Sequence, residues 1–231
     1  MGGAVQIIYD TSKDAGIVYD GGPDIGGPCG PYVQSERAAI YKEYAEKLVK
    51  LGGAYYCFCD RERLESLKDE NGVGRYDKHC LRLTEEEVRE KLAAGVPYVI
   101  RQNVPEEGTG SYEDLVYGKV SVDFKDIEDG ILLKSDGMPT YNFANVVDDH
   151  LMGITHVIRG SEYLSSTPKY NLMYDAFAWA RPAYIPLPPI PQDPREALTN
   201  RHRHPRFHEP LATRHLQAAR VHHPPPLACT H

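Results

Sequence analysis

The pattern of apolar positions along the chain predicts a buried helical face in residues 35–52. Apolar residues recur there three and four positions apart, which places them on one side of a helix. Ser35 stands where an N-cap is expected and Gly52-Gly53 where a helix ends. We expect this face to pack in the core. Its members are Ile40, Tyr41, Tyr44, Ala45 and Leu48.

Other segments carry clear start and stop signals. Residues 3–15 are predicted to form a helix that ends at Gly16, and residues 21–31 a loop rich in Gly and Pro. Thr84 and Glu87 have the spacing of a capping box, and Gly95 closes the short helix that follows. Strands are predicted at 98–102, 119–124 and 131–134. A last helix is expected to start with Thr167 as N-cap and Pro168 at the first helical position, with Leu172, Ala176 and Phe177 on one side.

The segment 139–168 combines these signals with polar groups suited to an acidic ligand. Tyr141 and Asn145 lie four residues apart, so a helix places them on one face. The apolar run 154–158 predicts a strand that stops at Arg159-Gly160. Arg159 therefore stands at the carboxyl end of a strand, where open α/β sheets bind ligands. A guanidinium group there can bind a carboxylate through two parallel hydrogen bonds, and the alternative is an ordinary surface ion pair.

Composition narrows the class of protein. The chain has 231 residues, 41% of them hydrophobic, which is ordinary for a globular protein with one sizeable domain and an insertion. No run is long enough to cross a membrane, and five Cys without a regular spacing fit a reducing compartment, so we expect a cytoplasmic protein. The formal net charge of −7 argues against non-specific binding of nucleic acid, although it leaves room for a local contact with RNA.

Three segments carry a resemblance to a known family. They are residues 16–37, which end in Gly-Pro-Tyr-Val-Gln-Ser-Glu-Arg, residues 55–59, which read Tyr-Tyr-Cys-Phe-Cys, and the segment 139–168. Through them the chain closely resembles bacterial-type glutamyl-tRNA synthetase from Gly3 to about Ile190. The resemblance implies ATP-dependent charging of tRNA(Glu) with L-glutamate, with ATP and Mg²⁺ as cofactors and a monomer as the expected state.

The resemblance also assigns roles and regions. Positions matching Tyr141, Asn145 and Arg159 contact the glutamate in that family, and those matching Glu162 and Tyr163 lie beside ATP. The implied fold is α/β, an incomplete Rossmann-like class I synthetase catalytic domain with an inserted α+β block that contacts the tRNA acceptor stem, and an unstructured C-terminal tail. The expected regions are 1–53 and 131–190 for the two parts of the catalytic domain, 54–130 for the block and 191–231 for the tail.

Parts of the family pattern are missing. Neither the early His-Ile-Gly-His-like motif nor the later Lys-Met-Ser-Lys-Ser-like loop is found, and residues 191–231 hold seven His, seven Pro and six Arg without Lys. Because both missing motifs stabilise phosphate charge, we expect this chain alone to fold poorly and to be inactive. Two alternatives remain: a non-catalytic fragment that contacts tRNA, and an enzyme similar to glutamyl-queuosine tRNA synthetase.

Three thiols form the candidate metal site. Zinc sites in the family use a similar Cys-x-Cys followed by Cys, which Cys57, Cys59 and Cys80 match. A fourth ligand is expected two positions after Cys80, where this chain has Arg82, with His79 nearby. Structural zinc is almost always four-coordinate, so the sequence favours reduced thiols over Zn²⁺. The run Asp148-Asp149-His150 is not expected to bind metal, because consecutive helical side chains point about 100° apart.

Overall fold

The computed structural model describes residues 2–70, 72 and 74–187, so the expected tail at 191–231 lies outside the described residues. Its α-helices are α1 (Gly2–Asp14), α2 (Ala38–Lys50), α3 (Arg61–Ser66), α4 (Glu85–Ala93), α5 (Tyr141–Leu151) and α6 (Thr167–Ala176). Its strands are β1 (Ala54–Cys57), β2 (Val99–Gln102), β3 (Thr109–Asp114), β4 (Gly118–Asp123), β5 (Ile131–Leu133), β6 (His156–Gly160) and β7 (Ala183–Leu187). Short 3-10 helices lie at Gln34–Arg37, His79–Arg82, Phe124–Asp126 and Ser161–Tyr163.

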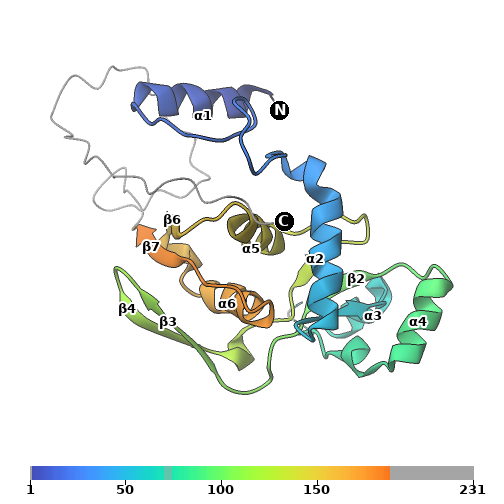
Figure 1. Ribbon diagram of the computed structural model, residues 1–231. Helices are drawn as coiled ribbons and strands as arrows, with labels where there is room; N and C mark the ends of the chain where they lie inside the picture. The colour runs from blue at the N-terminus through green and yellow to red at the C-terminus, as the bar shows by residue number, and fades with distance from the viewer. Residues whose placement is uncertain (1, 71, 73, 188–231) are drawn as a thin grey trace.

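The described strands form two sheets (Figure 1). The first has the order β1-β2-β5 and is antiparallel throughout. The second has the order β4-β3-β7-β6, in which β3 and β4 are antiparallel while β7 runs parallel to both β3 and β6. The parallel pairing expected of an α/β fold is therefore present around β7. The first sheet joins β5 to β1 and β2, so it crosses the expected boundary after residue 130.

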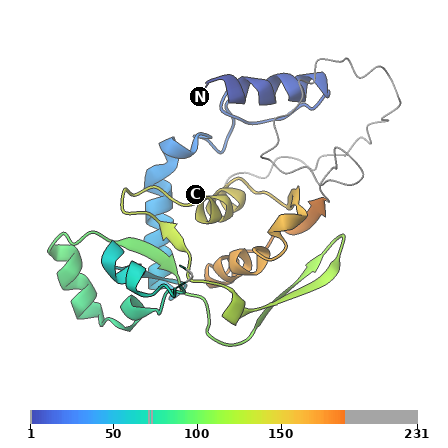
Figure 2. The same ribbon diagram turned by 180° about the vertical axis from the view of Figure 1, so that it is seen from behind.

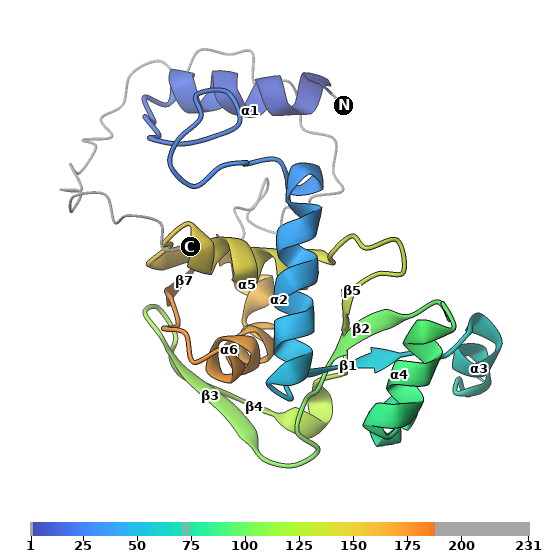
Figure 3. The same cartoon turned by 45° about the vertical axis from the view of Figure 1, so that its right-hand side comes forward.

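The main core lies where α2, α5 and α6 pack together and against β5 (Figure 3). Tyr41, Ala45 and Leu48 of α2 are fully buried, which confirms the predicted apolar face. Gly53 lies where α2 and α6 meet: a Cβ atom there would come within 2.7 Å of Leu48 Cδ1 and 2.8 Å of the Ala176 Cβ. A side chain at this position would therefore separate the two helices.

Aromatic rings close the far end of this core. Trp179 follows α6, and its ring stacks on His150 at a centroid distance of 3.7 Å and on Phe177 at 4.0 Å. His150 belongs to the last turn of α5. The stack therefore holds the ends of α5 and α6 together.

Helix α1 stands apart from this core, on the other side of the loop that leads into α2 (Figure 2). Its predicted end is confirmed, because the helix stops at Asp14 and Gly16 adopts a φ of +69°, which glycine tolerates. Ile7 and Ile8 are exposed. No described helix is both long and apolar enough to cross a membrane.

Local signals predicted α4 well. Thr84 Oγ1 accepts a hydrogen bond from the Glu87 backbone N–H, and the Glu87 carboxylate accepts one from the Thr84 backbone, so the capping box is confirmed. Gly95 ends the segment with a φ of +70°. The strands expected at 98–102, 119–124 and 131–134 are also present, within one residue at each end.

Two predicted N-caps are wrong. Ser35 lies inside the 3-10 helix Gln34–Arg37, and α2 begins only at Ala38, because the chain turns once before the α-helix starts. Thr167 is the first residue of α6 rather than its N-cap, which is Ser166, so Pro168 is the second helical residue and not the first. The Thr167 hydroxyl instead donates to the backbone oxygen of Tyr163 and ties the helix to the preceding turn.

The burial of α6 and the bounds of β6 also differ from expectation. Tyr170, Met173 and Tyr174 are buried in α6 with Phe177 after it, whereas Leu172 and Ala176 are only partly buried. Strand β6 covers His156–Gly160 rather than 154–158, so Arg159 lies within the strand. Parallel pairing with β7 extends the strand by two residues, because Arg159 and Gly160 lie opposite Pro186 and Leu187.

Candidate functional site

Helix α5 begins at the candidate ligand site. Tyr141 and Asn145 lie one turn apart, and the side chain of Tyr141 is exposed. Its ring lies 6.3 Å from that of Tyr163, centroid to centroid. Partial burial and the neighbouring Tyr163 raise the pKa of Tyr141, so it remains a neutral hydrogen-bond donor near neutral pH. Tyr141 therefore faces the turn that follows β6.

Arg159 lies among three tyrosine rings. Its Cζ atom is 4.9 Å from the Tyr170 ring centroid, 5.1 Å from that of Tyr163 and 5.4 Å from that of Tyr184. Tyr170 donates a hydrogen bond to Asn142 and Tyr184 donates one to Asn171, so neighbouring helices fix two of the rings. Cation–π contacts of this length hold the guanidinium group while leaving its edge free for an anion.

The alternative of a surface ion pair is not found. Arg159 is half-buried and forms no ion pair within 4.0 Å among the residues that the structure describes. Asn145 adds a polar atom without a partner, because its Oδ1 is buried and accepts no hydrogen bond within the described part of the chain. A half-buried cation and an orphaned amide oxygen suit a ligand with both a carboxylate and an N–H donor, which is the chemistry of an amino acid.

Glu162 and Tyr163 form the 3-10 turn directly after β6. The Glu162 carboxylate lies over Gly160, where any side chain would overlap it. Tyr163 contacts both Arg159 and Tyr141, so it joins the strand to the start of α5. The structure thus brings together four of the five residues predicted to bind substrate, while the Glu162 side chain is exposed and its carboxylate lies beside Gly160.

Three consecutive residues near the end of α5, Asp148, Asp149 and His150, make different contacts. The Asp148 carboxylate accepts hydrogen bonds from Arg37 Nε at 2.9 Å and Tyr41 Oη at 2.7 Å. Arg37, which is 2% exposed, also donates to the backbone oxygen atoms of Cys29 and Pro31. His150 stacks on Trp179. Asp148 therefore fastens the loop before α2 to the helix that carries Tyr141 and Asn145.

Asp149 makes folding stability depend on pH. Burial raises its pKa to about 6 against the ordinary 3.8, and the nearby Arg159 only partly opposes this. The folded state therefore holds a proton that the unfolded state has lost, and this contribution to stability falls as pH rises from about 4 to about 6. Asparagine does not titrate, so Asp149→Asn does not lose stability as pH rises. The difference in free energy of unfolding between the variant and the unchanged protein should therefore grow in favour of the variant from about pH 4 to about pH 6, and it should persist at higher pH. Urea unfolding between pH 4 and 8 measures the difference, and a difference independent of pH would contradict the assignment.

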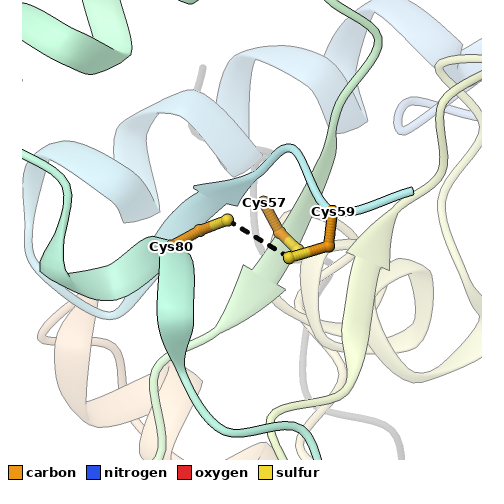
Figure 4. Close-up of side chains that lie close together, drawn as sticks. All are labelled: Cys57, Cys59 and Cys80. Carbon is orange, nitrogen blue, oxygen red and sulfur yellow. Dashed lines mark hydrogen bonds between the residues drawn. The ribbon is translucent and has the colours of Figure 1, made fainter. Parts of the chain in front are cut away.

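The three candidate metal-binding thiols come together (Figure 4). Cys57 ends β1, Cys59 follows it, and Cys80 lies in the 3-10 helix His79–Arg82. Their sulfur atoms all lie within 4.8 Å of one another, and Cys59 Sγ and Cys80 Sγ are 3.5 Å apart. Burial raises the pKa of Cys59 to about 11. Neither Arg82 nor His79 belongs to this group of possible metal ligands.

Tyr76 supplies a fourth donor that the sequence did not indicate. Its hydroxyl oxygen lies 3.3 Å from Cys57 Sγ and 3.4 Å from Cys59 Sγ, and it accepts a hydrogen bond from the Cys80 backbone N–H. The donor set is therefore three thiols and a phenol around one point, which fits a four-coordinate thiophilic cation such as Zn²⁺. A tyrosine four residues before a cysteine has no regular metal-ligand spacing, so only the fold reveals it.

A family model and curated relatives agree with the resemblance seen in the sequence. The family model for the catalytic domain of tRNA synthetases class I (E and Q) matches residues 2–211. The chain is 58% identical over 221 residues to the glutamate–tRNA ligase of Clostridium tetani and 56% identical over 221 residues to that of Clostridium kluyveri. Each match covers 94% of this chain and 45% of the relative, so the chain spans about half the length of these curated relatives.

Solved structures give the same result for the fold. A glutamate tRNA ligase from Elizabethkingia meningosepticum, in complex with its amino acid, matches with a TM-score of 0.79 and 37% identity. That match covers 87% of this chain and 42% of the other. The glutamate-tRNA synthetase of Elizabethkingia anophelis matches with a TM-score of 0.77 at 36% identity, over 87% of this chain and 43% of that one.

Proposed function

The chain belongs to the class I tRNA synthetases of the glutamate and glutamine group, and from this membership we propose that it supplies the amino-acid pocket of a glutamate–tRNA ligase. In such an enzyme the glutamate carboxylate attacks the α-phosphate of ATP, which forms glutamyl-adenylate and releases pyrophosphate. The 3′-terminal ribose of tRNA(Glu) then takes the glutamyl group, which releases AMP. The alternatives are a fragment that contacts tRNA without catalysis and an enzyme that glutamylates a modified queuosine base in tRNA.

The observation that carries the proposal is the charge of Arg159, which forms no ion pair within 4.0 Å in the described part of the chain. A ligand carboxylate can take two parallel hydrogen bonds from its guanidinium group. Asn145 and Tyr141 offer an acceptor and a donor on the same side. A ligand with two carboxylates and one amine, such as L-glutamate, satisfies this set better than an uncharged amino acid does.

ATP and Mg²⁺ are proposed to meet the chain at the turn after β6. Glu162 is exposed there, and Tyr163 presents an aromatic ring beside Arg159. Activation requires two anions, the glutamate carboxylate and the α-phosphate, to approach each other. Arg159 offsets the charge of the first, which lowers the repulsion between them.

The block 54–130 is proposed to contact the acceptor stem of tRNA(Glu). It contains β1–β4 with α3 and α4, and its helices lie on the outside of the molecule, away from α5 and α6 (Figure 3). The two parts of the catalytic domain at 1–53 and 131–190 would then hold the small substrates. We further propose that the protein acts as a monomer in the cytoplasm.

A bound Zn²⁺ is proposed to hold this block together. The expectation of reduced thiols rested on the lack of a fourth donor, and Tyr76 now stands in that position beside Cys57, Cys59 and Cys80. The cation would join β1 to the segment around residues 76–80. The 3-10 helix His79–Arg82 in that segment is too short to be stable alone.

A chimeric enzyme tests the proposed function. The segment of the Clostridium tetani ligase that matches this chain is replaced by residues 5–187, and pyrophosphate exchange is measured with ATP, Mg²⁺, glutamate and tRNA. We expect glutamate-dependent exchange within about tenfold of the parent, because the pocket residues make the same contacts whichever polypeptide carries them. The parent enzyme and glutamine as substrate are the controls.

Each alternative has its own outcome in this assay. A chimera that folds and binds tRNA in a filter assay but shows no exchange would support the non-catalytic fragment. Exchange that proceeds with glutamate in the absence of tRNA, followed by glutamylation of only queuosine-containing tRNA, would support the queuosine enzyme. A chimera that uses glutamine as well as glutamate would overturn the assigned pocket.

A further inference from the structure

Beneath the thiol cluster lies a buried guanidinium group that has no carboxylate partner. Arg101 is 8% exposed and belongs to β2, where it pairs with Tyr55 of β1. Side chains two residues apart on a strand share a face, so Tyr55, Cys57 and Arg101 lie on one side of this sheet. Arg101 is therefore a diagonal neighbour of Cys57.

The hydrogen bonds of Arg101 leave its charge uncompensated. One guanidinium nitrogen donates to the backbone oxygen of Asp129, Nε is buried without a partner, and the Cζ atom lies 4.3 Å from the Tyr76 ring centroid. The nearby carboxylate of Asp129 is already paired with Lys78 and accepts a hydrogen bond from Tyr55. Two buried cations thus share one buried carboxylate, which leaves a net positive charge in this part of the core.

A second arginine near the cluster also has a guanidinium nitrogen without a partner. The Nε atom of Arg63 is also buried without a partner, although its terminal nitrogen pairs with Asp77. Arg63 lines a pocket together with Cys59 and Cys80. Orphaned guanidinium nitrogens therefore flank the three sulfur atoms, and an orphaned buried donor requires an explanation.

We propose that Arg101, assisted by Arg63, is the counter-ion of an anionic metal–thiolate centre formed by Cys57, Cys59 and Cys80. The proposal rests on the Zn²⁺ site proposed above. Three thiolates around one divalent cation carry a net charge of −1, and the neutral phenol of Tyr76 does not change it. Arg101 lies over the Tyr76 ring and diagonally across from Cys57, so it would act on the metal through the ligands and is a positioning residue.

This role has a consequence that a purely structural role lacks. Without metal, Arg101 has no carboxylate partner, and a buried cation without an anion lowers stability. With metal bound, the same charge stabilises the anionic centre. Removing the charge of Arg101 should therefore change stability in opposite directions in the two states.

The experiment compares the 231-residue chain with Arg101→Gln and Arg101→Lys. Zn²⁺ affinity is measured by competition with a chromophoric chelator, the thiolate-to-Co²⁺ absorption band reports the ligands, and urea unfolding is followed with and without Zn²⁺. We expect one metal per unchanged chain and about 10–100-fold weaker Zn²⁺ binding by Arg101→Gln, the effect usual for residues that support metal ligands. Arg101→Lys, which keeps the charge, should recover most of the affinity.

The controls separate the possible failures. Arg181→Gln, which removes an exposed arginine paired with Asp175, should leave metal affinity unchanged. Failure of the unchanged chain to bind Zn²⁺ or Co²⁺ would overturn the metal site itself. Equal affinity of Arg101→Gln and the unchanged chain would overturn the counter-ion alone. A variant destabilised equally with and without Zn²⁺ would show that Arg101 has only a structural role, which also contradicts the proposal.

Discussion

Asp148→Ala is expected to lower the free energy of unfolding by about 3–5 kcal/mol, the cost of leaving a buried charge without its partner. Arg37 is 2% exposed and has its only ion pair among the described residues with Asp148. Tyr41 would lose the acceptor of its hydroxyl in the same substitution. Urea unfolding measured by circular dichroism gives the change in free energy.

An exposed acid provides the control for this prediction. Asp175 pairs with Arg181, and both side chains are more than a third exposed, so Asp175→Ala should cost at most about 1 kcal/mol. The double variant Arg37→Met/Asp148→Leu removes both charges and should be more stable than Asp148→Ala alone, because no unpaired charge remains. Equal losses for Asp148→Ala and Asp175→Ala would show that the buried pair does not fasten α5.

Replacing Arg159 by Lys in the chimeric enzyme should reduce kcat/KM for glutamate by about 30-fold or more, since truncating a hydrogen-bonded charge pair typically costs at least about 2 kcal/mol. Lysine keeps the positive charge but has no planar fork to bind a carboxylate at two points. It would also lose the flat contacts with the Tyr163 and Tyr170 rings. Steady-state pyrophosphate exchange at varied glutamate and ATP measures both substrates separately.

The comparison between the two substrates is decisive here. The KM for ATP should change by no more than about threefold, because Arg159 is proposed to bind the glutamate carboxylate and not the phosphates of ATP. Lys169→Arg, a charge-conserving change at the start of α6, serves as the matched control and should leave glutamate use intact. An Arg159→Lys enzyme with an unchanged response to glutamate would remove Arg159 from the pocket.

The features predicted correctly from sequence are those that a few neighbouring residues determine. Thr84 and Glu87 satisfy each other's backbone groups, so their spacing alone specifies the start of α4. Tyr141 and Asn145 share a face because any helix makes them do so. The strand of Arg159 was displaced by two residues, because its end is set by pairing with β7, more than twenty residues later in the chain.

Long-range pairing also explains the elements that were missed. Strand β7 contains Pro186, which ordinarily argues against a strand in the interior of a sheet. It is tolerated because β3 pairs with β7 only at Tyr184, so the Pro186 position needs no hydrogen bond on that side. Strand β3 begins Thr-Gly-Ser, a sequence typical of loops, and gains its order from six paired positions on β4.

The metal site likewise combines contacts that the sequence predicts with contacts that only the fold creates. Sequence spacing brings Cys57 and Cys59 together, whereas Tyr76 joins them only because the chain folds back beneath β1. Arg101 could not be recognised as unpaired from sequence, because the Lys78–Asp129 ion pair that excludes it joins residues about fifty positions apart. Unsatisfied charge is a property of the folded core.

The ring stack at the end of α5 gives the protein an optical reporter of its own. Trp179 is the only tryptophan in the chain, so all indole emission arises at the point where His150 and Phe177 contact it. Asn145 lies on the same helix as His150. Fluorescence measured without any label therefore follows the docking of α5 on α6, and a ligand that shifts this helix at its first turn should be visible as a change of emission at its last.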